Sequence, residues 1–107
     1  MSQHHFDASY KGKPAQVVAG YDRPLREFFV RISLKDSPEI IYSSLYEPMT
    51  DWSSADAVEA ALTRRRIQIP ERFIAQLRLD QANNTGNLVM RHHLGGAAPE
   101  VLYPRQA

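Results

Sequence analysis

The sequence predicts an α+β fold: a two-layer sandwich in which two helices cover one face of a mostly antiparallel sheet of four to five strands. Residues 5–47 consist of short segments in which many apolar residues recur at every second position, whereas residues 53–84 show helical spacing. Turns containing Gly or Pro separate several of the strand-like segments, which is typical of an antiparallel meander. Each apolar face must be buried against another layer, and one sheet with one helical layer is the simplest arrangement.

Residues 26–34 give the clearest strand signal. Their even-numbered positions are apolar from Phe28 to Leu34, and these side chains should face the core. The segments predicted as strands are 5–12, 15–21, 26–34 and 39–47, followed by a last strand at 87–93.

Two helices are expected between the fourth and the last strand. Ser53 and Asp56 resemble a capping box at the start of the first helix, and Pro70 suits the first position of the second. A left-handed residue should end the second helix at Asn83, Asn84 or Gly86. The residues expected on its buried face are Phe73, Ile74, Leu77 and Gln81.

The chain of 107 residues is long enough for one domain with its own core. We expect this domain at 1–93 and a loosely ordered tail at 94–107, because the tail has two Gly, two Pro and no clear period. The sequence has no cysteine, no apolar signal segment at its start and no apolar run that could span a bilayer. These features predict a cytoplasmic protein without membrane contact.

Charge is unevenly distributed along the chain. Residues 36–59 hold six acidic residues and no Lys or Arg, whereas residues 60–107 hold seven Arg and three acidic residues. This segregation allows two outcomes: a dipolar surface that orients a partner, or segments that pack together and neutralise each other.

Two polar stretches are candidate recognition loops. Asp22 and Arg23 precede Pro24 between two predicted strands, and Asp80, Asn84 and Asn87 surround the end of the second helix. Turn and capping chemistry alone accounts for these residue types. The alternative is a ligand or partner site, since binding residues concentrate on loops held by a rigid scaffold.

The sequence gives a weaker signal for nucleic-acid binding. Five arginines form a candidate nucleic-acid patch, but helix-end Arg residues also complement the helix dipole, and no aromatic stacking motif accompanies them. They are Arg64, Arg65, Arg66, Arg72 and Arg78.

The pairs His4–His5 and His92–His93 lack the spacing of a metal site, so we expect ordinary surface or boundary histidines, no metal and no cofactor. The sequence contains no phosphate loop, nucleophile elbow or His-Glu-x-x-His motif. It therefore predicts no enzymatic activity.

The stretches Gly20–Leu25 and Asp80–Asn87 resemble a group of small, uncharacterised bacterial proteins of about this length. Those proteins share a Gly-aromatic-Asp-Arg-Pro-Leu stretch before an aromatic strand, and an Asp-Gln-x-x-Asn-x-Gly-Asn stretch after an amphipathic helix. The resemblance would cover most of residues 4–93. It implies a bacterial cytoplasmic protein with no assigned activity.

The expected function is that of a small binding or accessory module, monomeric or weakly dimeric, that contacts an unknown protein partner. The contact would use the acidic segment 36–59 or the two polar loops. Two alternatives remain: a nucleic-acid-binding module that uses the five arginines, which the modest charge does not favour, and a small-ligand binder or enzyme at the Asp22 and Asn84 loops.

Overall fold

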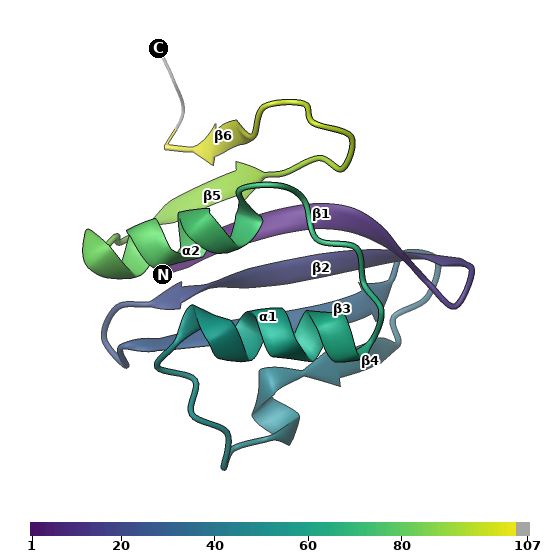
Figure 1. Cartoon of the computed structure of the whole chain (residues 1–107), viewed down its shortest axis with the longest axis horizontal. Helices are drawn as coiled ribbons and strands as arrows, with labels where there is room; N and C mark the ends of the chain where they lie inside the picture. Colours follow the sequence, from purple (N-terminus) through teal and green to yellow (C-terminus); the bar gives the residue numbers. More distant parts are fainter. Residues whose placement is uncertain (105–107) are drawn as a thin grey trace.

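The computed structural model describes residues 1–104, which form an α+β sandwich with one mixed sheet and two helices (Figure 1). Within these residues the sheet has six strands, slightly more than the sequence predicts. The strands are β1 (Ser2–Tyr10), β2 (Lys13–Asp22), β3 (Glu27–Leu34), β4 (Ile40–Ser43), β5 (Leu88–Arg91) and β6 (Glu100–Tyr103).

The strand order is β4-β3-β2-β1-β5-β6, so β1 lies inside the sheet and not at its edge. Strands β1 to β4 form the predicted antiparallel meander. β5 pairs with β1 in parallel, and β6 returns antiparallel to β5. The parallel pairing requires a crossover after β4, and the two helices provide it.

Helices α1 (Ala55–Arg64) and α2 (Phe73–Ala82) both lie on one face of the sheet (Figure 1). The shortest dimension of the molecule is 23 Å, as two layers require. The opposite sheet face has no covering element among residues 1–104.

The core lies between the helices and the inward face of the sheet, as predicted from the alternation in β3. Phe73, Leu62 and Leu77 are completely buried in it. The even-numbered β3 residues Phe28 to Ile32 belong to the same cluster, so the predicted inward face is confirmed.

The ends of both helices differ from the prediction. Ser54, not Ser53, caps α1: its hydroxyl accepts a hydrogen bond from the Asp56 amide (3.1 Å). α2 begins at Phe73 after a left-handed Arg72 without a side-chain cap, so Pro70 precedes the helix. Beyond the helix end, Asn84 takes the expected left-handed conformation, with φ of 50°.

One predicted position on the buried face of α2 is wrong. Gln81 is exposed, and its side-chain amide donates to the Ser53 carbonyl. Asp80 takes the buried place, with 1% of its surface exposed. Seven residues separate Asp80 from Phe73, which is two helical turns, so Asp80 lies on the same face.

Strand boundaries also differ: the strand predicted at 5–12 is Ser2–Tyr10, and the one predicted at 87–93 is Leu88–Arg91. The predicted strand 39–47 ends at Ser43, whose hydroxyl accepts from the Leu45 amide and caps the short 3₁₀ helix η1 (Ser44–Tyr46). The predicted tail contains β6, although all four side chains of this strand are exposed. Residues 105–107 of that tail lie outside the described part of the chain. None of the helices within residues 1–104 has the length and apolar character needed to cross a membrane.

Candidate functional site

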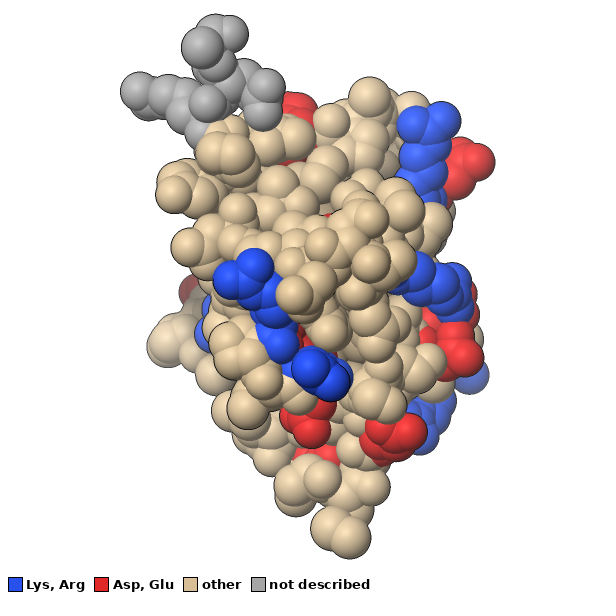
Figure 2. All heavy atoms as spheres, turned by 90° about the vertical axis from the view of Figure 1, so that its left-hand side faces the viewer, with Lys and Arg blue, Asp and Glu red and all other residues tan. Residues whose placement is uncertain are grey.

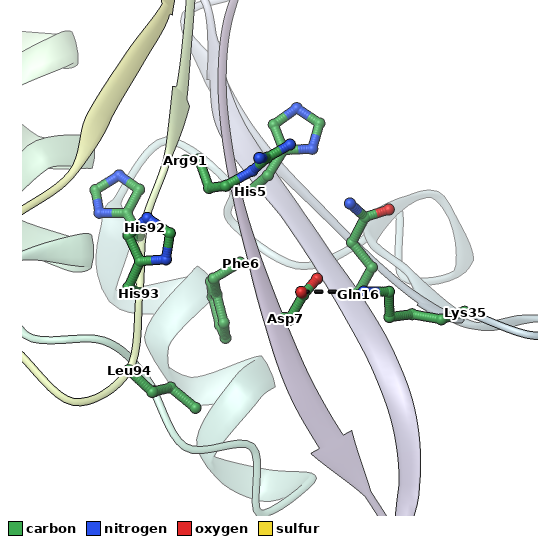
Figure 3. Close-up of a pocket in the computed structure, with 9 residues that line it drawn as sticks. All are labelled: His5, Phe6, Asp7, Gln16, Lys35, Arg91, His92, His93 and Leu94. Atoms are coloured by element: carbon green, nitrogen blue, oxygen red, sulfur yellow. Dashed lines mark hydrogen bonds and ion pairs between the residues drawn. The ribbon is translucent and has the colours of Figure 1, made fainter. Parts of the chain in front are cut away.

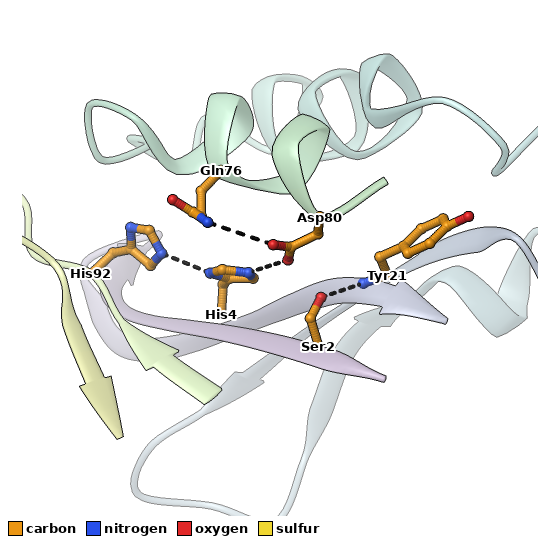
Figure 4. Close-up of polar contacts among 6 residues, drawn as sticks. All are labelled: Ser2, His4, Tyr21, Gln76, Asp80 and His92. Carbon is orange, nitrogen blue, oxygen red and sulfur yellow. Dashed lines mark hydrogen bonds and ion pairs between the residues drawn. The ribbon is translucent and has the colours of Figure 1, made fainter. Parts of the chain in front are cut away.

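A buried polar network joins β1, α2 and the end of β5 (Figure 4). The Nε2 atom of His4 lies 2.5 Å from Oδ2 of Asp80, and both side chains are almost fully buried. Gln76, one turn earlier on α2, donates to the other carboxylate oxygen (3.5 Å). A carboxylate inside a protein is costly unless it is paired, so His4 and Gln76 make the burial of Asp80 tolerable.

His92 extends the network toward the C-terminal end of β5. Its Nε2 atom lies 2.9 Å from Nδ1 of His4, and its ring meets the edge of the Phe73 ring at a centroid distance of 5.0 Å. Burial, together with the nearby His4, lowers the pKa of His92 to about 4. His92 is therefore neutral at pH 7.

The second ring nitrogen of His92, Nδ1, is buried and has no hydrogen-bond partner among residues 1–104. Buried polar atoms are nearly always satisfied in native proteins, so an orphan of this kind needs an explanation. The prediction of ordinary surface or boundary histidines is thus wrong for His4 and His92. One signal was available in the sequence, since one member of each adjacent pair on a strand must face the helices.

His92 also lines a groove of about 550 Å³ at the open edge of β1. β5 pairs with β1 only as far as His5, and the chain then turns away after Arg91. The groove residues come from both sides of β1 (Figure 3): His5 and Arg91 lie toward the uncovered sheet face, and Phe6 lies toward the helices. Burial, together with Arg91, His4 and Arg31, lowers the pKa of His5.

The two predicted recognition loops lie side by side, at one end of the sheet. A Cβ atom placed on Gly86 would lie 3.4 Å from the Arg23 guanidinium. Asp22 accepts a bond from the Leu25 amide in its own loop (3.4 Å), as the turn interpretation expects. Within residues 1–104, Arg23 forms no ion pair with a carboxylate. Asn87 accepts from the Met1 amine (3.2 Å).

The side chains of the second loop do not converge on one point. Asp80 points into the core toward His4, whereas Asn84 and Asn87 are exposed. Figure 2 shows this end of the molecule, where Lys and Arg side chains are scattered among uncharged residues.

The five arginines of the candidate nucleic-acid patch are divided among different environments. Arg65 stacks on the Tyr42 ring (3.5 Å from guanidinium carbon to ring centroid), and Arg78 forms an ion pair with Asp56 (2.5 Å). Arg64, Arg66 and Arg72 are exposed. Two contacts, Arg78–Asp56 and Arg65–Glu47, join the acidic and basic segments, so these partly neutralise each other.

An exposed apolar surface, which we call the apolar tip, consists of Leu45, Tyr46 and Met49. Their exposed fractions are 85%, 60% and 95%, although all three are large hydrophobic residues. The tip lies at the lower end of the molecule in Figure 1, and Figure 2 shows acidic side chains around the uncharged lower end. The sequence does not reveal it, because residues 44–46 read as the continuation of a strand.

Partly buried hydrogen bonds beside the apolar tip hold Glu47, which lies between Tyr46 and Met49. The Trp52 indole donates to the Glu47 carbonyl (3.0 Å), and the Tyr42 hydroxyl donates to the Glu47 carboxylate. Burial and this contact with Glu47 raise the pKa of Tyr42 to about 12. The tip is therefore an apolar surface on a rigid support.

Residues 1–104 contain no group of three His, Cys, Asp or Glu side chains that could hold a metal ion. Comparisons with known proteins add no functional clue: no protein-family model, no curated protein and no solved structure matches this chain.

Proposed function

We propose that this protein is a small, non-catalytic binding module that acts by contact with another protein, with the apolar tip as its docking surface. The observation that carries the proposal is the exposure of Leu45 and Met49, at 85% and 95%. Water-exposed clusters of large apolar side chains in soluble proteins commonly mark interaction sites. The rigid support under the tip favours binding, since little conformational entropy is lost when a partner covers it.

The charge around the tip defines the partner further. The tip lies inside the acidic segment 36–59, and Arg65 and Arg78 pair with only two of its six acids, Glu47 and Asp56. Asp51, two residues after Met49, is exposed. The complementary partner surface has an apolar pocket with a basic rim. The resemblance of Gly20–Leu25 and Asp80–Asn87 to small bacterial proteins supports a bacterial, cytoplasmic setting.

The test compares a tip variant with a matched control. In the tip variant Leu45 and Met49 become Ser; in the control Leu25 and Leu79, which are exposed elsewhere, become Ser. Proteins captured from the native host by the wild-type chain are purified, and their affinities for all three chains are measured by calorimetry. We expect the tip variant to bind about tenfold or more weakly and the control to bind as the wild type does.

Equal binding by the tip variant and the wild type would contradict the proposal. Hydrogen exchange provides the second measurement. The partner should slow exchange of the backbone amides of residues 44–51, and slowing confined to another surface would place the interface there.

A further inference from the structure

The second half of β1 leaves one side of its backbone free. β1 pairs with β2 as far as Tyr10 in a regular register, whereas β5 pairs with β1 only as far as His5. The next amide of the chain after β5, that of His92, donates to the His5 carbonyl (2.7 Å), and no further backbone bond to β1 follows in the described part of the chain. Residues 6–10 of β1 therefore have no neighbouring strand on the β5 side.

The backbone groups that face this free side belong to Asp7 and Ser9. Successive residues of a strand direct their backbone groups alternately to the two sides of the strand. The His5 carbonyl faces the β5 side, since it accepts a hydrogen bond there, and the two-residue turn of the β1–β2 hairpin makes the backbone of Tyr10 face β2. Asp7 and Ser9 lie an even number of positions from His5, so their N–H and C=O groups face the free side and lack a partner within residues 1–104.

The free side of β1 opens into the groove described above. Phe6 and Asp7 line this groove, and Asp7 and Ser9 are exposed. Leu94 lies on the same side of β1 as Phe6, toward the helices, and Arg91 lies on the opposite side (Figure 3). An extended segment that continues the line of β5 would lie between these two walls.

This part of β1 lacks the features that protect the outer edges of the sheet. The outer strands β4 and β6 have four residues each, and a register shift interrupts the pairing of each with its neighbour. Short strands and bulges discourage pairing with another chain. β1 has nine residues, and its register with β2 is uninterrupted. Its free half is thus the most regular unpaired backbone in the described sheet.

We propose that the free half of β1 binds an extended acidic peptide segment of another protein, which adds to the sheet as a strand beside residues 6–10. In strand addition, main-chain hydrogen bonds give affinity and alternate side chains give specificity. The backbones of Asp7 and Ser9 each supply one donor and one acceptor for these bonds. The apolar tip lies beyond β4, on the other side of the sheet, so this inference does not rest on the proposed function.

The charges of the groove favour an acidic peptide. Arg91 and Lys35 are the cations of the lining, and Asp7, which pairs with Lys35 (3.0 Å), is its only carboxylate. Arg91 is exposed and forms no ion pair within residues 1–104. Glu100, the neighbour of Arg91 on β6, lies outside the lining and contacts His93 (2.9 Å). The groove therefore has one guanidinium available for a peptide carboxylate.

The two walls of the groove also define the pattern of the peptide. Peptide residues opposite Asp7 and Ser9 would point to the uncovered sheet face, on which Arg91 lies. The residues between them would point toward the helices, where Phe6 and Leu94 provide apolar contact. The expected ligand is a segment in which acidic and apolar residues alternate.

The test uses two capped pentapeptides: acetyl-Val-Glu-Val-Glu-Val-amide and the same peptide with Lys in place of Glu. Each is titrated into the ¹⁵N-labelled full chain. We expect saturable binding of the Glu peptide and binding of the Lys peptide that is about tenfold or more weaker. In the free protein the amides of Asp7 and Ser9 should exchange with solvent faster than that of Ala8, which faces β2, and the Glu peptide should slow them.

Ser9→Pro and Ser9→Ala form a matched pair. Proline removes the N–H group on the free side without removing a bond to β2, whereas alanine removes only an exposed hydroxyl. We expect Ser9→Pro to bind the Glu peptide about tenfold or more weakly and Ser9→Ala to bind it as the wild type does. Arg91→Ala should lower the preference for Glu over Lys about fivefold or more, whereas Arg31→Ala, on the same sheet face but outside the groove, should keep it.

Any of four results would overturn the proposal. The first is slow exchange of the Asp7 and Ser9 amides in the free protein, since a second copy of the chain or another segment would then occupy the edge. The second is the absence of saturable binding of the Glu peptide, and the third is equal affinity for the two peptides. The fourth is equal binding by Ser9→Ala and a Ser9→Pro chain whose amide spectrum shows the native fold.

Discussion

At Gly20 two backbone segments approach so closely that no side chain fits between them. A Cβ atom on Gly20 would lie 1.9 Å from the Ser2 carbonyl oxygen and 2.9 Å from the Phe29 ring. Gly20 does not need glycine for its φ angle, since only Gly12, Gly95 and Gly96 have positive φ among the glycines. Its role is steric: it lets the start of β1 pack against β2 and thereby positions His4.

Gly20→Ala should therefore lower the free energy of unfolding by about 2 kcal/mol or more, because the backbone of β1 must move. Gly86→Ala is the matched control. Its nearest neighbour is the flexible end of Arg23, 3.4 Å from the added Cβ, so the change should stay below about 1 kcal/mol. Urea unfolding of both variants measures the difference, and equal effects would contradict the steric role of Gly20.

The stability of the protein should fall in acid because of His92. Its folded-state pKa of about 4 lies below the ordinary value of 6.5, so the unfolded chain binds the proton more readily. The resulting stability is fully present above pH 6.5 and is lost as the pH falls toward 4. The expected loss is roughly 3 kcal/mol at 1.36 kcal/mol per pKa unit, and His5 acts in the same direction.

Urea unfolding between pH 7 and pH 4 measures this dependence, and His92→Phe is the informative variant. Phenylalanine keeps the ring contact with Phe73 but cannot titrate. The variant will be less stable at pH 7 because His4 loses a partner, but its stability should change less with pH. An equally steep pH dependence in His92→Phe would show that another group causes it.

The sequence draws attention to the two histidine pairs but does not indicate which residues His4 and His92 contact. His4 and His92 are 88 residues apart and meet only because β5 pairs with β1. Alternation within a strand predicts which face a side chain occupies, but it does not predict which strands become neighbours. The same limit applies to Asp22 and Arg23, whose local turn was predicted and whose proximity to Gly86 was not.

At the level of single helices and strands, local hydrogen bonds determine the residues at which an element begins and ends. The alternation in β3 was sufficient to predict its core face, whereas the start of α1 was predicted one residue early. Ser53 and Ser54 are both good capping residues, and only the backbone path decides between them. Ser54 has extended dihedral angles and accepts from the Asp56 amide, whereas Ser53 bonds to Asp51.

Ser54→Ala should lower the free energy of unfolding by about 1 kcal/mol, as the loss of an N-cap commonly does. Ser53→Ala should change it by less than about 0.5 kcal/mol, because its contacts with Asp51 are exposed. Thermal unfolding of the two variants is sufficient to compare them. A larger loss of stability in Ser53→Ala than in Ser54→Ala would show that Ser53 is the N-cap residue, as the sequence predicts.

At the level of the whole molecule, the strands toward the two edges of the sheet contribute differently to the core. The meander of β1 to β4 and the helices form the core, whereas β6 contributes four exposed side chains. Among residues 1–104, every buried hydrophobic residue lies within the predicted domain of residues 1–93: the core cluster extends from Phe6 to Leu77, and Met90 is the last buried hydrophobic residue. The sixth strand could not be predicted, because its residues bury no face and so show no alternation.

Removal of the chain after Ala98 should therefore leave the fold intact. The truncated protein loses β6 and the partly exposed contact of His93 with Glu100, which contributes little to stability. β5 then becomes an edge strand of four residues, which is too short to favour aggregation. The free energy of unfolding should fall by less than it does in Phe73→Ala, for which we expect a loss of about 3–5 kcal/mol because Phe73 is completely buried. Urea unfolding and the amide spectrum of both proteins test this order of stability. A truncated chain that is less stable than Phe73→Ala would show that β6 is part of the folding unit. Loss of the dispersed amide signals of β1 and β5 in the truncated chain would show the same.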